Sequence, residues 1–559
     1  MPLTDDDLLS VQHARSLAQA AREAQGQLAE LSQERIDGIV AAMASAALAE
    51  SHRLARLAHE ETGFGNVEDK TRKNTFCAVD VHEYIKPMRT VGVIREDDQT
   101  GVVEIAEPMG VVAAIIPSTN PTSTAIFKAL ISIKARNAVV MSPHPSALRC
   151  IVETVRIMHG PAVAAGLPAA ALSCLEPVTL EGTQELMRHR ATGVILATGG
   201  IGLVRAAYSS GKPAYGVGPG NVPAYIHESA DVPQAVTDVI NGKTFDYGTL
   251  CSSEQSIVCD ESIRDQVVAE VKKNGGYFLS DEEVAAVSRV VVTPRRLANP
   301  AIVGRPATEI AEKAGVKVPA DTRVLVAPLT GVGRDYPLSI EKLSPVLAFY
   351  SVKDWHEGCE RCLQLLRFGG TGHSLGIHCR DDSIIREFAL KKPVFRIIAN
   401  SQTSMGATGY TTGLAPSMSL GCGAYAGNIT SDNITPMHLM NTKRLAYGRT
   451  PGRSRLGMPV ATSPDSMGPT HAQASALRDR ISQFVTGKLG APTIRAAAST
   501  AEAAPAPVPP AETVDFVAED DVRRALQQGR TIALAPGAIV TPSARDLAAG
   551  QRVLIQVDG

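Results

Sequence analysis

The sequence lacks the features of membrane, secreted and nucleic-acid-binding proteins. No apolar run approaches the ~20 residues that a bilayer span needs. Residues 1–7 lack the basic start and apolar core of a secretion signal. The chain has 55 lysines and arginines and 57 aspartates and glutamates, a net charge of −2. It therefore has no excess of positive charge that would indicate binding to nucleic acid or a membrane. We therefore expect a cytoplasmic protein that acts on a small molecule.

The nine cysteines lack the pairing pattern of a disulfide framework. Their number is odd and they are spread through a long chain, which favours free thiols in a reducing compartment. Cys359-Glu-Arg-Cys362 has the spacing of half a zinc or redox site, but no second pair or nearby histidine completes it. We predict no metal site and place this pair on a helix.

The usual dinucleotide fingerprint is also missing. No G-x-G-x-x-G follows the first strand of the α/β region, residues 111–116. Gly199-Gly-Ile-Gly202 follows a later strand and opens a helix, so its backbone N–H groups can face an anion or the nicotinamide end of a cofactor. This pattern by itself does not establish a nucleotide site.

Strands and helices alternate along most of the chain. A length of 559 residues exceeds the size of one core, so we expect at least two domains. Residues 5–60 have helical spacing, and residues 91–94 and 102–105 predict a β-hairpin. From Gly110 the pattern predicts doubly wound α/β domains with parallel sheets. The predicted strands are 111–116, 138–141, 171–175, 193–197 and 224–226, and the predicted helices are 121–135, 146–160, 180–189 and 201–209.

These patterns divide the chain into five parts. Residues 1–228 are predicted to form N-terminal helices and a dinucleotide-binding domain, completed by residues 411–448, and residues 229–410 a catalytic domain. Residues 449–490 are an irregular extension, and residues 491–512 are an Ala- and Pro-rich linker. Residues 513–559 form a small module whose core is marginal unaided, so we expect it to dock on something.

The module is predicted to begin with an amphipathic helix. Glu519 starts this helix, its apolar stripe is Val522, Ala525 and Leu526, and Gly529 is its C-cap. Residues 531–535, 538–540 and 553–557 are predicted as short strands, and residues 543–549 as a helix turn.

Cys251 is the candidate nucleophile. It lies between Asp246-Tyr-Gly-Thr-Leu and Ser-Ser-Glu-Gln, just before the apolar segment Ile257-Val-Cys259. This pattern is typical of a thiol on a loop that precedes a strand. The alternative is that Cys251 packs as a small buried hydrophobe.

Seven ordered motifs carry a resemblance to a known family. They are residues 116–128, 142–145, 197–200, 209–221, 243–255, 341–346 and 369–373. On these motifs, residues from about 107 to 448 resemble the CoA-acylating aldehyde dehydrogenases. The resemblance implies an aldehyde dehydrogenase-like α/β fold of two doubly wound domains, an oligomerisation hairpin and a dimer or tetramer. It also implies a small aldehyde substrate, CoA as acyl acceptor and NAD as cofactor, with NADP left open.

The resemblance also implies roles for single residues. Cys251 resembles the nucleophile, Asn120 resembles the amide that holds the oxyanion, and Glu341 resembles the glutamate that contacts the nicotinamide ribose. His373 is a candidate acid/base or CoA-contacting group, with a structural histidine as the alternative. His144 is a cofactor-binding candidate with the same alternative. The other cofactor-binding candidates are Pro117, Ser118, Thr119, Ser142, Pro143, Thr198, Gly199, Gly200, Gly218 and Pro345.

The resemblance implies that aldehyde oxidation leaves a thioester on Cys251, and Gly216 bears on how this thioester is released. Hydrolytic members of the superfamily have at this position a glutamate that activates the deacylating water. Water is a poor nucleophile without a base, whereas CoA brings a thiol, so we expect acyl-CoA from a short-chain aldehyde of the propionaldehyde or acetaldehyde type. The alternatives are a non-acylating dehydrogenase that releases a free acid and a catalytically weak cargo scaffold. Residues 397–410 follow the family loosely and are expected to shape substrate choice.

The tail carries a second resemblance. Residues 520–526, 529–530 and 538–547 resemble C-terminal extensions of enzymes housed in bacterial microcompartments. In those extensions a short amphipathic helix binds shell or cargo proteins in a groove, which implies a place in the microcompartment lumen. The alternative is a tail that packs on its own oligomer.

Overall fold

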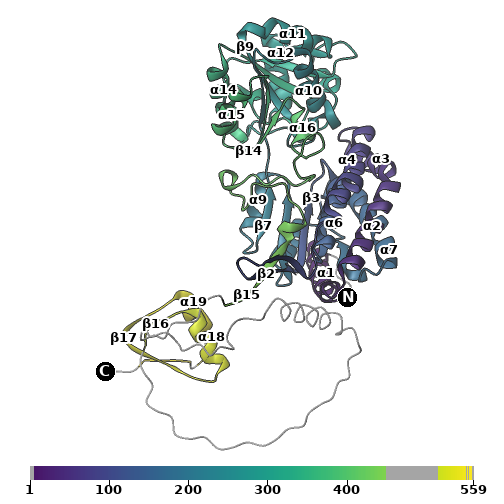
Figure 1. The fold of residues 1–559 in the computed structure, drawn as a ribbon. Coiled ribbons are helices and arrows are strands. Elements are labelled where there is room, and N and C mark those ends of the chain that lie inside the picture. The colour runs from purple at the N-terminus through teal and green to yellow at the C-terminus, as the bar shows by residue number, and fades with distance from the viewer. Residues whose placement is uncertain (1–4, 449–513, 549–550, 552, 557–559) are drawn as a thin grey trace, which may run out of the picture. The chain divides into compact units, whose positions relative to one another are not determined.

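The computed structural model describes residues 5–448, 514–548, 551 and 553–556 (Figure 1). The chain divides into two compact units, Met1–Ser463 and Pro464–Gly559, and each is described by itself. The predicted irregular extension, 449–490, and the predicted linker, 491–512, lie outside the described residues. Within the described part, no helix is both long and apolar enough to cross a membrane.

Helices at the start of the chain pack against the first sheet. The helical prediction for residues 5–60 is confirmed. Small side chains at helical spacing on α1, such as Ala14, Ala18 and Ala21, are fully buried and allow close packing. The elements are α1 (Asp6–Ala29), α2 (Gln33–Ala49), α3 (Ser51–Thr62), α4 (Val67–Phe76), a π-helical turn (Cys77–Val81) and α5 (His82–Ile85).

The first sheet is parallel, with strand order β5-β4-β3-β6-β7. Every residue of β3 is buried, as expected for a strand covered on both faces. The strand order reverses between β3 and β6, and such a switch point is where ligands bind in open α/β sheets. The strands are β3 (Val111–Ile116), β4 (Ala138–Pro143), β5 (Leu172–Cys174), β6 (Thr192–Thr198) and β7 (Ala214–Val217), and the helices are α6 (Pro121–Lys134), α7 (Leu148–Ala164), α8 (Leu180–Arg188) and α9 (Ile201–Tyr208).

The predicted hairpin is confirmed and gains a third strand. β1 (Val93–Asp97) pairs antiparallel with β2 (Val102–Pro108). β15 (Met440–Ala446), more than 300 residues later in the chain, pairs antiparallel with β2 along its whole length. The small sheet therefore joins the segment just before the first parallel sheet to the end of the first unit's described chain.

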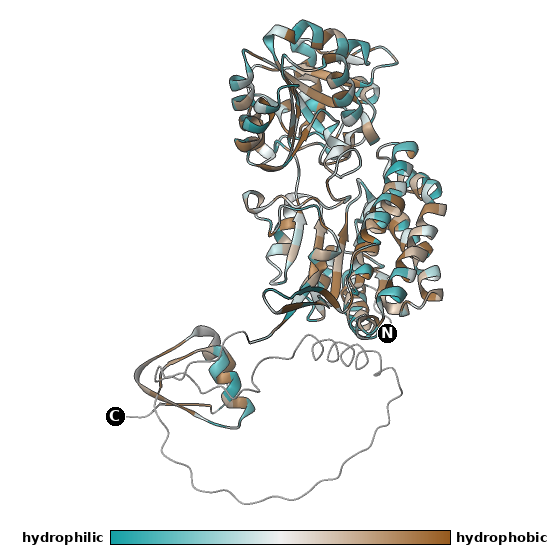
Figure 2. Cartoon of the chain, in the orientation of Figure 1, coloured by the Kyte–Doolittle hydropathy of each residue, from teal (hydrophilic) through white to brown (hydrophobic). Residues whose placement is uncertain are grey.

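The second sheet has the strand order β10-β11-β12-β9-β8-β13-β14, all parallel. Alternate strand residues enter separate cores: Ala224 and Ile226 pack with α10 and α11, whereas Tyr225 packs with α14 and α15. Figure 2 shows hydrophobic residues gathered on the strands. The strands are β8 (Val222–Ile226), β9 (Glu254–Asp260), β10 (Gly276–Phe278), β11 (Val324–Pro328), β12 (Val346–Val352), β13 (Gly372–His378) and β14 (Val394–Ala399), and the helices are α10 (Val232–Thr244), α11 (Arg264–Lys273), α12 (Asp281–Val291), α13 (Ala307–Lys313), α14 (Trp355–Gly369), α15 (Asp382–Leu390) and α16 (Thr403–Gly406).

The predicted boundary at residue 228 is wrong by one strand. β8 pairs with β9 and β13 of the second sheet, not with the first sheet. All five of its residues are buried, and a buried apolar strand looks the same in sequence whichever sheet it joins. Cys359 and Cys362 lie on α14, as predicted.

The second unit is a parallel three-stranded sheet with order β16-β17-β18. The predicted strands 531–535 and 538–540 are instead one strand, and β16 was not predicted. Gln528 is the C-cap of the first helix, and Gly529 follows it with φ +59°. The elements are β16 (Val514–Val517), α18 (Glu519–Gln527), β17 (Ile532–Val540), α19 (Pro542–Ala548) and β18 (Leu554–Gln556).

The apolar stripe of α18 is used inside this unit. Val522 is fully buried and Ala525 nearly so, in one cluster with residues of α19 and the sheet. This packing leaves no stripe for a partner's groove, so the expected helix-in-groove mode is wrong for this structure. Large apolar side chains are exposed on the strands instead: Phe516 is 58%, Ile539 64% and Ile555 49% exposed.

Candidate active site

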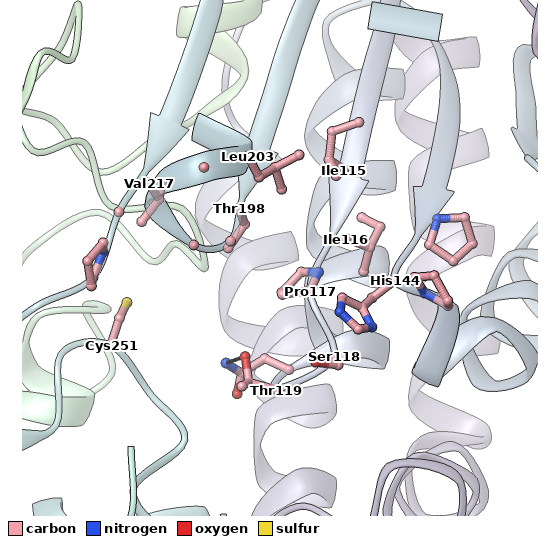
Figure 3. Close-up of a pocket in the computed structure, with 18 of the residues that line it drawn as sticks. Ile115, Ile116, Pro117, Ser118, Thr119, His144, Thr198, Leu203, Val217 and Cys251 are labelled. Carbon is pink, nitrogen blue, oxygen red and sulfur yellow. Dashed lines mark hydrogen bonds between the residues drawn. The ribbon is translucent and has the colours of Figure 1, made fainter. Parts of the chain in front are cut away.

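A cavity of about 530 Å³ opens at the switch point of the first sheet. Its walls come from the carboxyl ends of β3, β4, β6 and β7, from the segments that follow them, and from the turn that carries Cys251. Figure 3 shows Cys251 on one side, Pro117, Ser118 and His144 on the other, and Thr198 between them. The volume is in the usual range for small-molecule and cofactor pockets.

The cavity brings together most of the residues that the sequence predicted. Those that line it are Cys251, Asn120, Glu341, Pro117, Ser118, Thr119, Pro143, His144, Thr198, Gly199, Gly200 and Gly218. Ser142, Pro345 and His373 are not among the described residues that line it, nor is any of residues 397–410. The Ser142 hydroxyl lies 2.8 Å from the Thr183 hydroxyl, and the Pro345 carbonyl accepts from the Leu325 N–H.

Cys251 lies where the sequence placed it, on a turn just before β9. Its side chain is half-buried and faces the cavity. Burial, and after it the carboxylate of Glu341, raises the pKa of the Cys251 thiol to about 12, while the Arg396 guanidinium acts in the opposite direction. The thiol is therefore protonated at neutral pH in this structure.

Glu341 reaches the cavity from the loop before β12. Its Oε1 accepts a hydrogen bond from the Gly220 N–H at 2.8 Å. Burial raises the pKa of this carboxyl to about 7, against the opposing effect of the Gly220 hydrogen bond. Across the cavity, Gly200 is the N-cap of α9, so the backbone N–H groups of this helix start face the same space.

Asn120 caps α6 without using its side chain for the cap. Its Nδ2 lies 3.3 Å from the Thr249 carbonyl oxygen and 3.2 Å from the Thr119 hydroxyl, and both of these residues line the cavity. The amide nitrogen therefore lies beside the turn that carries the thiol, with both of its N–H groups on protein acceptors in this structure.

His373 is fully buried at the start of β13. Its Nδ1 lies 3.1 Å from the Ser374 hydroxyl, and its Nε2 has no hydrogen-bond partner. Burial lowers the pKa of this imidazole to about 3, with a smaller contribution from Arg396. The ring is neutral and packs against Gly220, whose added Cβ would lie 2.9 Å from the ring.

Comparisons with known proteins agree with this geometry. Residues 6–275 match the aldehyde dehydrogenase family. The crystal structure of an acetylating aldehyde dehydrogenase from Geobacillus thermoglucosidasius has 54% sequence identity and a TM-score of 0.80, over 81% of this chain and 100% of that one. The chain belongs to the aldehyde dehydrogenase family.

Two more relatives place the chain within this family. It is 43% identical over 442 residues to the bifunctional aldehyde-alcohol dehydrogenase AdhE of Escherichia coli, and it spans 50% of the length of that protein. A propionaldehyde dehydrogenase from the fucose utilisation bacterial microcompartment of Clostridium phytofermentans has a TM-score of 0.70 and 27% identity, over 77% of this chain and 96% of that one.

Gly216 has no room for the glutamate of hydrolytic family members. An added Cβ would lie 2.7 Å from both the Tyr208 Oη and the Val204 Cγ1. The Gly216 N–H also donates to the Tyr208 hydroxyl at 3.1 Å. A side chain at position 216 would therefore have to displace Tyr208 and Val204 of α9.

Three residues of the site were missed by the sequence analysis. Lys70 and Lys73 of α4 and Asp246 of the loop before Cys251 form a buried ion cluster directly behind Asn120. Asp246 lies inside a motif that carried the resemblance, but α4 precedes residues 107–448, over which the resemblance was drawn. A lysine pair three residues apart on a polar helix gives no sign of burial, since such pairs are usually solvated.

The raised pKa of Cys251 has a measurable consequence. Between pH 7 and pH 9 the thiolate fraction should rise about tenfold per pH unit, because both values lie well below the pKa of about 12. We expect the rate of iodoacetamide labelling of Cys251, followed by peptide mass spectrometry on the protein without cofactor, to rise in the same proportion. A rate independent of pH in this range would mean that the thiol is already ionised, contrary to its surroundings.

Proposed function

We propose that the chain oxidises a short-chain aldehyde, of the propionaldehyde or acetaldehyde type, with NAD and CoA to acyl-CoA and NADH. The observation that carries the proposal is one cavity that holds the Cys251 thiol, the Asn120 amide and the Glu341 carboxylate, with Gly216 closed to a hydrolytic base. The acetylating relative and the microcompartment propionaldehyde dehydrogenase support the reaction type and the substrate class.

Cys251 is the nucleophile of this reaction. The thiol first loses its proton to water. The thiolate then bonds to the aldehyde carbonyl carbon, and the carbonyl oxygen becomes negative. The Asn120 Nδ2 and the Cys251 backbone N–H donate to that oxygen, a contribution of about 3 kcal/mol for each such donor. After hydride loss a thioester remains on Cys251. The CoA thiolate then attacks it, so that the new carbon–sulfur bond forms and the bond to Cys251 breaks.

The residues present fit a nicotinamide cofactor. The apolar side chains of Ile116, Leu203 and Val217 line the cavity beside the start of α9, and Glu341 offers its carboxylate to a ribose hydroxyl. When bound, the cofactor supplies the hydride acceptor. We assign NAD rather than NADP by resemblance, with Pro117, Ser118, Thr119, Pro143, His144, Thr198, Gly199, Gly200 and Gly218 as contacts and Ser142 and Pro345 in support behind them.

His373 is a positioning residue in this proposal. Its buried, neutral ring packs on Gly220, whose N–H holds Glu341, so it shapes the turn that carries the ribose-binding carboxylate. It is not among the described residues that line the cavity, so the proposal gives it no acid/base role.

The test is NADH formation by the purified full chain with propionaldehyde and NAD, with and without CoA, and mass analysis of the product. We expect turnover that depends on CoA and yields a thioester. Equal turnover without CoA, yielding free acid, would establish the non-acylating alternative. No turnover with a panel of short aldehydes, in folded protein, would favour the cargo scaffold.

We further propose that the second unit attaches the enzyme to shell or cargo proteins in a microcompartment lumen, and that the hairpin sheet serves a dimer or tetramer. A parallel sheet is normally covered on both faces, and Phe516, Ile539 and Ile555 remain exposed here. The fluorescently tagged full chain should gather in puncta in cells that build microcompartments, and Phe516→Glu with Ile539→Glu should disperse it. Puncta unchanged by both substitutions would refute this surface.

A further inference from the structure

Two buried lysines lie behind the oxyanion donor. Lys70 and Lys73 are three residues apart on α4 and are 2% and 1% exposed. Both ammonium groups donate to the same oxygen, Oδ2 of Asp246, which is itself fully buried. Burial alone would raise the pKa of Asp246, but the two ammonium groups outweigh it and hold this pKa below its usual value. The carboxylate is therefore ionised and anchors both lysines.

The two lysines have different second partners. Lys73 Nζ also donates to Oδ1 of the Asn120 side chain and lies 3.5 Å from the Thr249 hydroxyl. Lys70 Nζ donates at 3.2 Å to the backbone carbonyl of Thr119. Only Lys73 contacts the side chain that holds the oxyanion.

The Lys73 contact decides which way the Asn120 amide faces. A lysine ammonium has hydrogen-bond donors and no acceptor, so only the oxygen end of the amide can hydrogen-bond to it. The NH₂ end must then point the other way, toward the Thr249 carbonyl and the cavity. The cap of α6 does not constrain this side chain, because it makes no capping hydrogen bond. Without Lys73, only the 3.3 Å contact of Nδ2 with the Thr249 carbonyl would oppose a flip that presents the amide oxygen to a negative substrate atom.

The conformation and packing of the loop that carries Asp246 fix the position of its carboxylate. Asp246 and Tyr247 have φ values of +48° and +51°, a left-handed conformation that non-glycine residues adopt at a cost. Oδ1 of Asp246 accepts from the Asn66 N–H at 2.8 Å, and Oδ2 accepts from the Thr249 hydroxyl at 2.6 Å. At Gly65, an added Cβ would lie 1.8 Å from Oδ1, so the chain there must be glycine. This left-handed loop conformation and the close packing at Gly65 hold the Asp246 carboxylate in contact with Lys73.

We propose that Lys73, anchored by Asp246, is a positioning residue that holds the Asn120 amide with its N–H donors toward the oxyanion. The proposal rests on the proposed aldehyde oxidation, in which Asn120 is the donor. Lys73 does not line the cavity, so it acts through Asn120 and not on the substrate.

A double-mutant cycle on the full chain tests this role. Asn120→Ala should lower kcat for CoA-dependent NADH formation about 100-fold, the usual loss for one oxyanion donor, with little change in KM for NAD. Lys73→Met should lower kcat at least tenfold, and Lys73→Arg should recover part of it because guanidinium is also a donor only. Adding Lys73→Met to Asn120→Ala should cost nothing further.

The matched control is Lys70→Met, which removes the other ammonium from the same carboxylate without touching the Asn120 side chain. Its loss of kcat should be smaller and should multiply with that of Asn120→Ala. Multiplicative losses for Lys73→Met with Asn120→Ala would overturn the proposal. An inactive wild-type chain would instead overturn the aldehyde oxidation on which it rests, so the two failures are distinguishable.

Discussion

Replacing Cys251 by alanine is expected to abolish NADH formation, with a loss of at least about 10⁴-fold, because no covalent adduct can form without the thiol. Cys251 is the cysteine that lines the cavity among the described residues, so no neighbouring thiol there can substitute for it. The loss should apply equally to aldehyde oxidation and to the reverse reduction of acyl-CoA, since both pass through the same thioester in the proposed mechanism. Absorbance of NADH in both directions measures it.

The control is Cys259→Ala, on the strand that follows. Cys259 is fully buried in the second sheet's core and does not line the cavity, so this variant should retain turnover. Binding of NAD by the Cys251→Ala variant, followed by fluorescence quenching, would show that the site is still formed. Residual CoA-dependent turnover in Cys251→Ala would mean that another group carries the acyl chain.

The Asp246→Ala substitution is expected to lower the free energy of unfolding more than the other substitutions proposed here. It removes the shared partner of two buried ammonium groups, and an uncompensated buried charge of this kind costs about 3–5 kcal/mol. It also frees the Thr249 hydroxyl and the Asn66 N–H. Urea unfolding at pH 7 should show this change in the free energy of unfolding.

A matched control is Asp382→Ala, which breaks an ion pair with Arg386 on the surface of α15. That pair is 2.6 Å long but mostly exposed, so its loss should change the unfolding free energy far less. Raising the pH should partly rescue Asp246→Ala, because burial already lowers the pKa of Lys73 to about 8 with Asp246 present, and a neutral amine has no charge to leave unpaired. Equal stability losses in the two variants would show that the cluster is not a buried ionic anchor.

Local pattern predicted much of the secondary structure. Continuous apolar runs such as Val111–Ile116 gave β3 correctly, since a fully buried strand has no polar face to interrupt it. Alternation of strands and helices predicted parallel, doubly wound sheets, and both are present. Short elements were not predicted. β7 has four residues, two of them Tyr215 and Gly216, and this is too little apolar sequence to identify a strand.

The sequence by itself determined the motifs and the chemical type of the site. A cysteine in a turn before a strand is readable from the residues themselves, whereas the roles of Asn120 and Gly216 follow from the resemblance that the motifs carry. Cys251 and Asn120 meet in one cavity.

Only the tertiary structure decided which groups surround those residues. β8 belongs to the second sheet, and the apolar stripe of α18 is buried within its own unit. His373 is buried and does not line the cavity, and Lys73 lies behind Asn120. The physical reason is the same in each case. Burial and the direction of a hydrogen bond depend on segments far apart in the chain, such as α4 and the loop of Asp246, which only folding brings together.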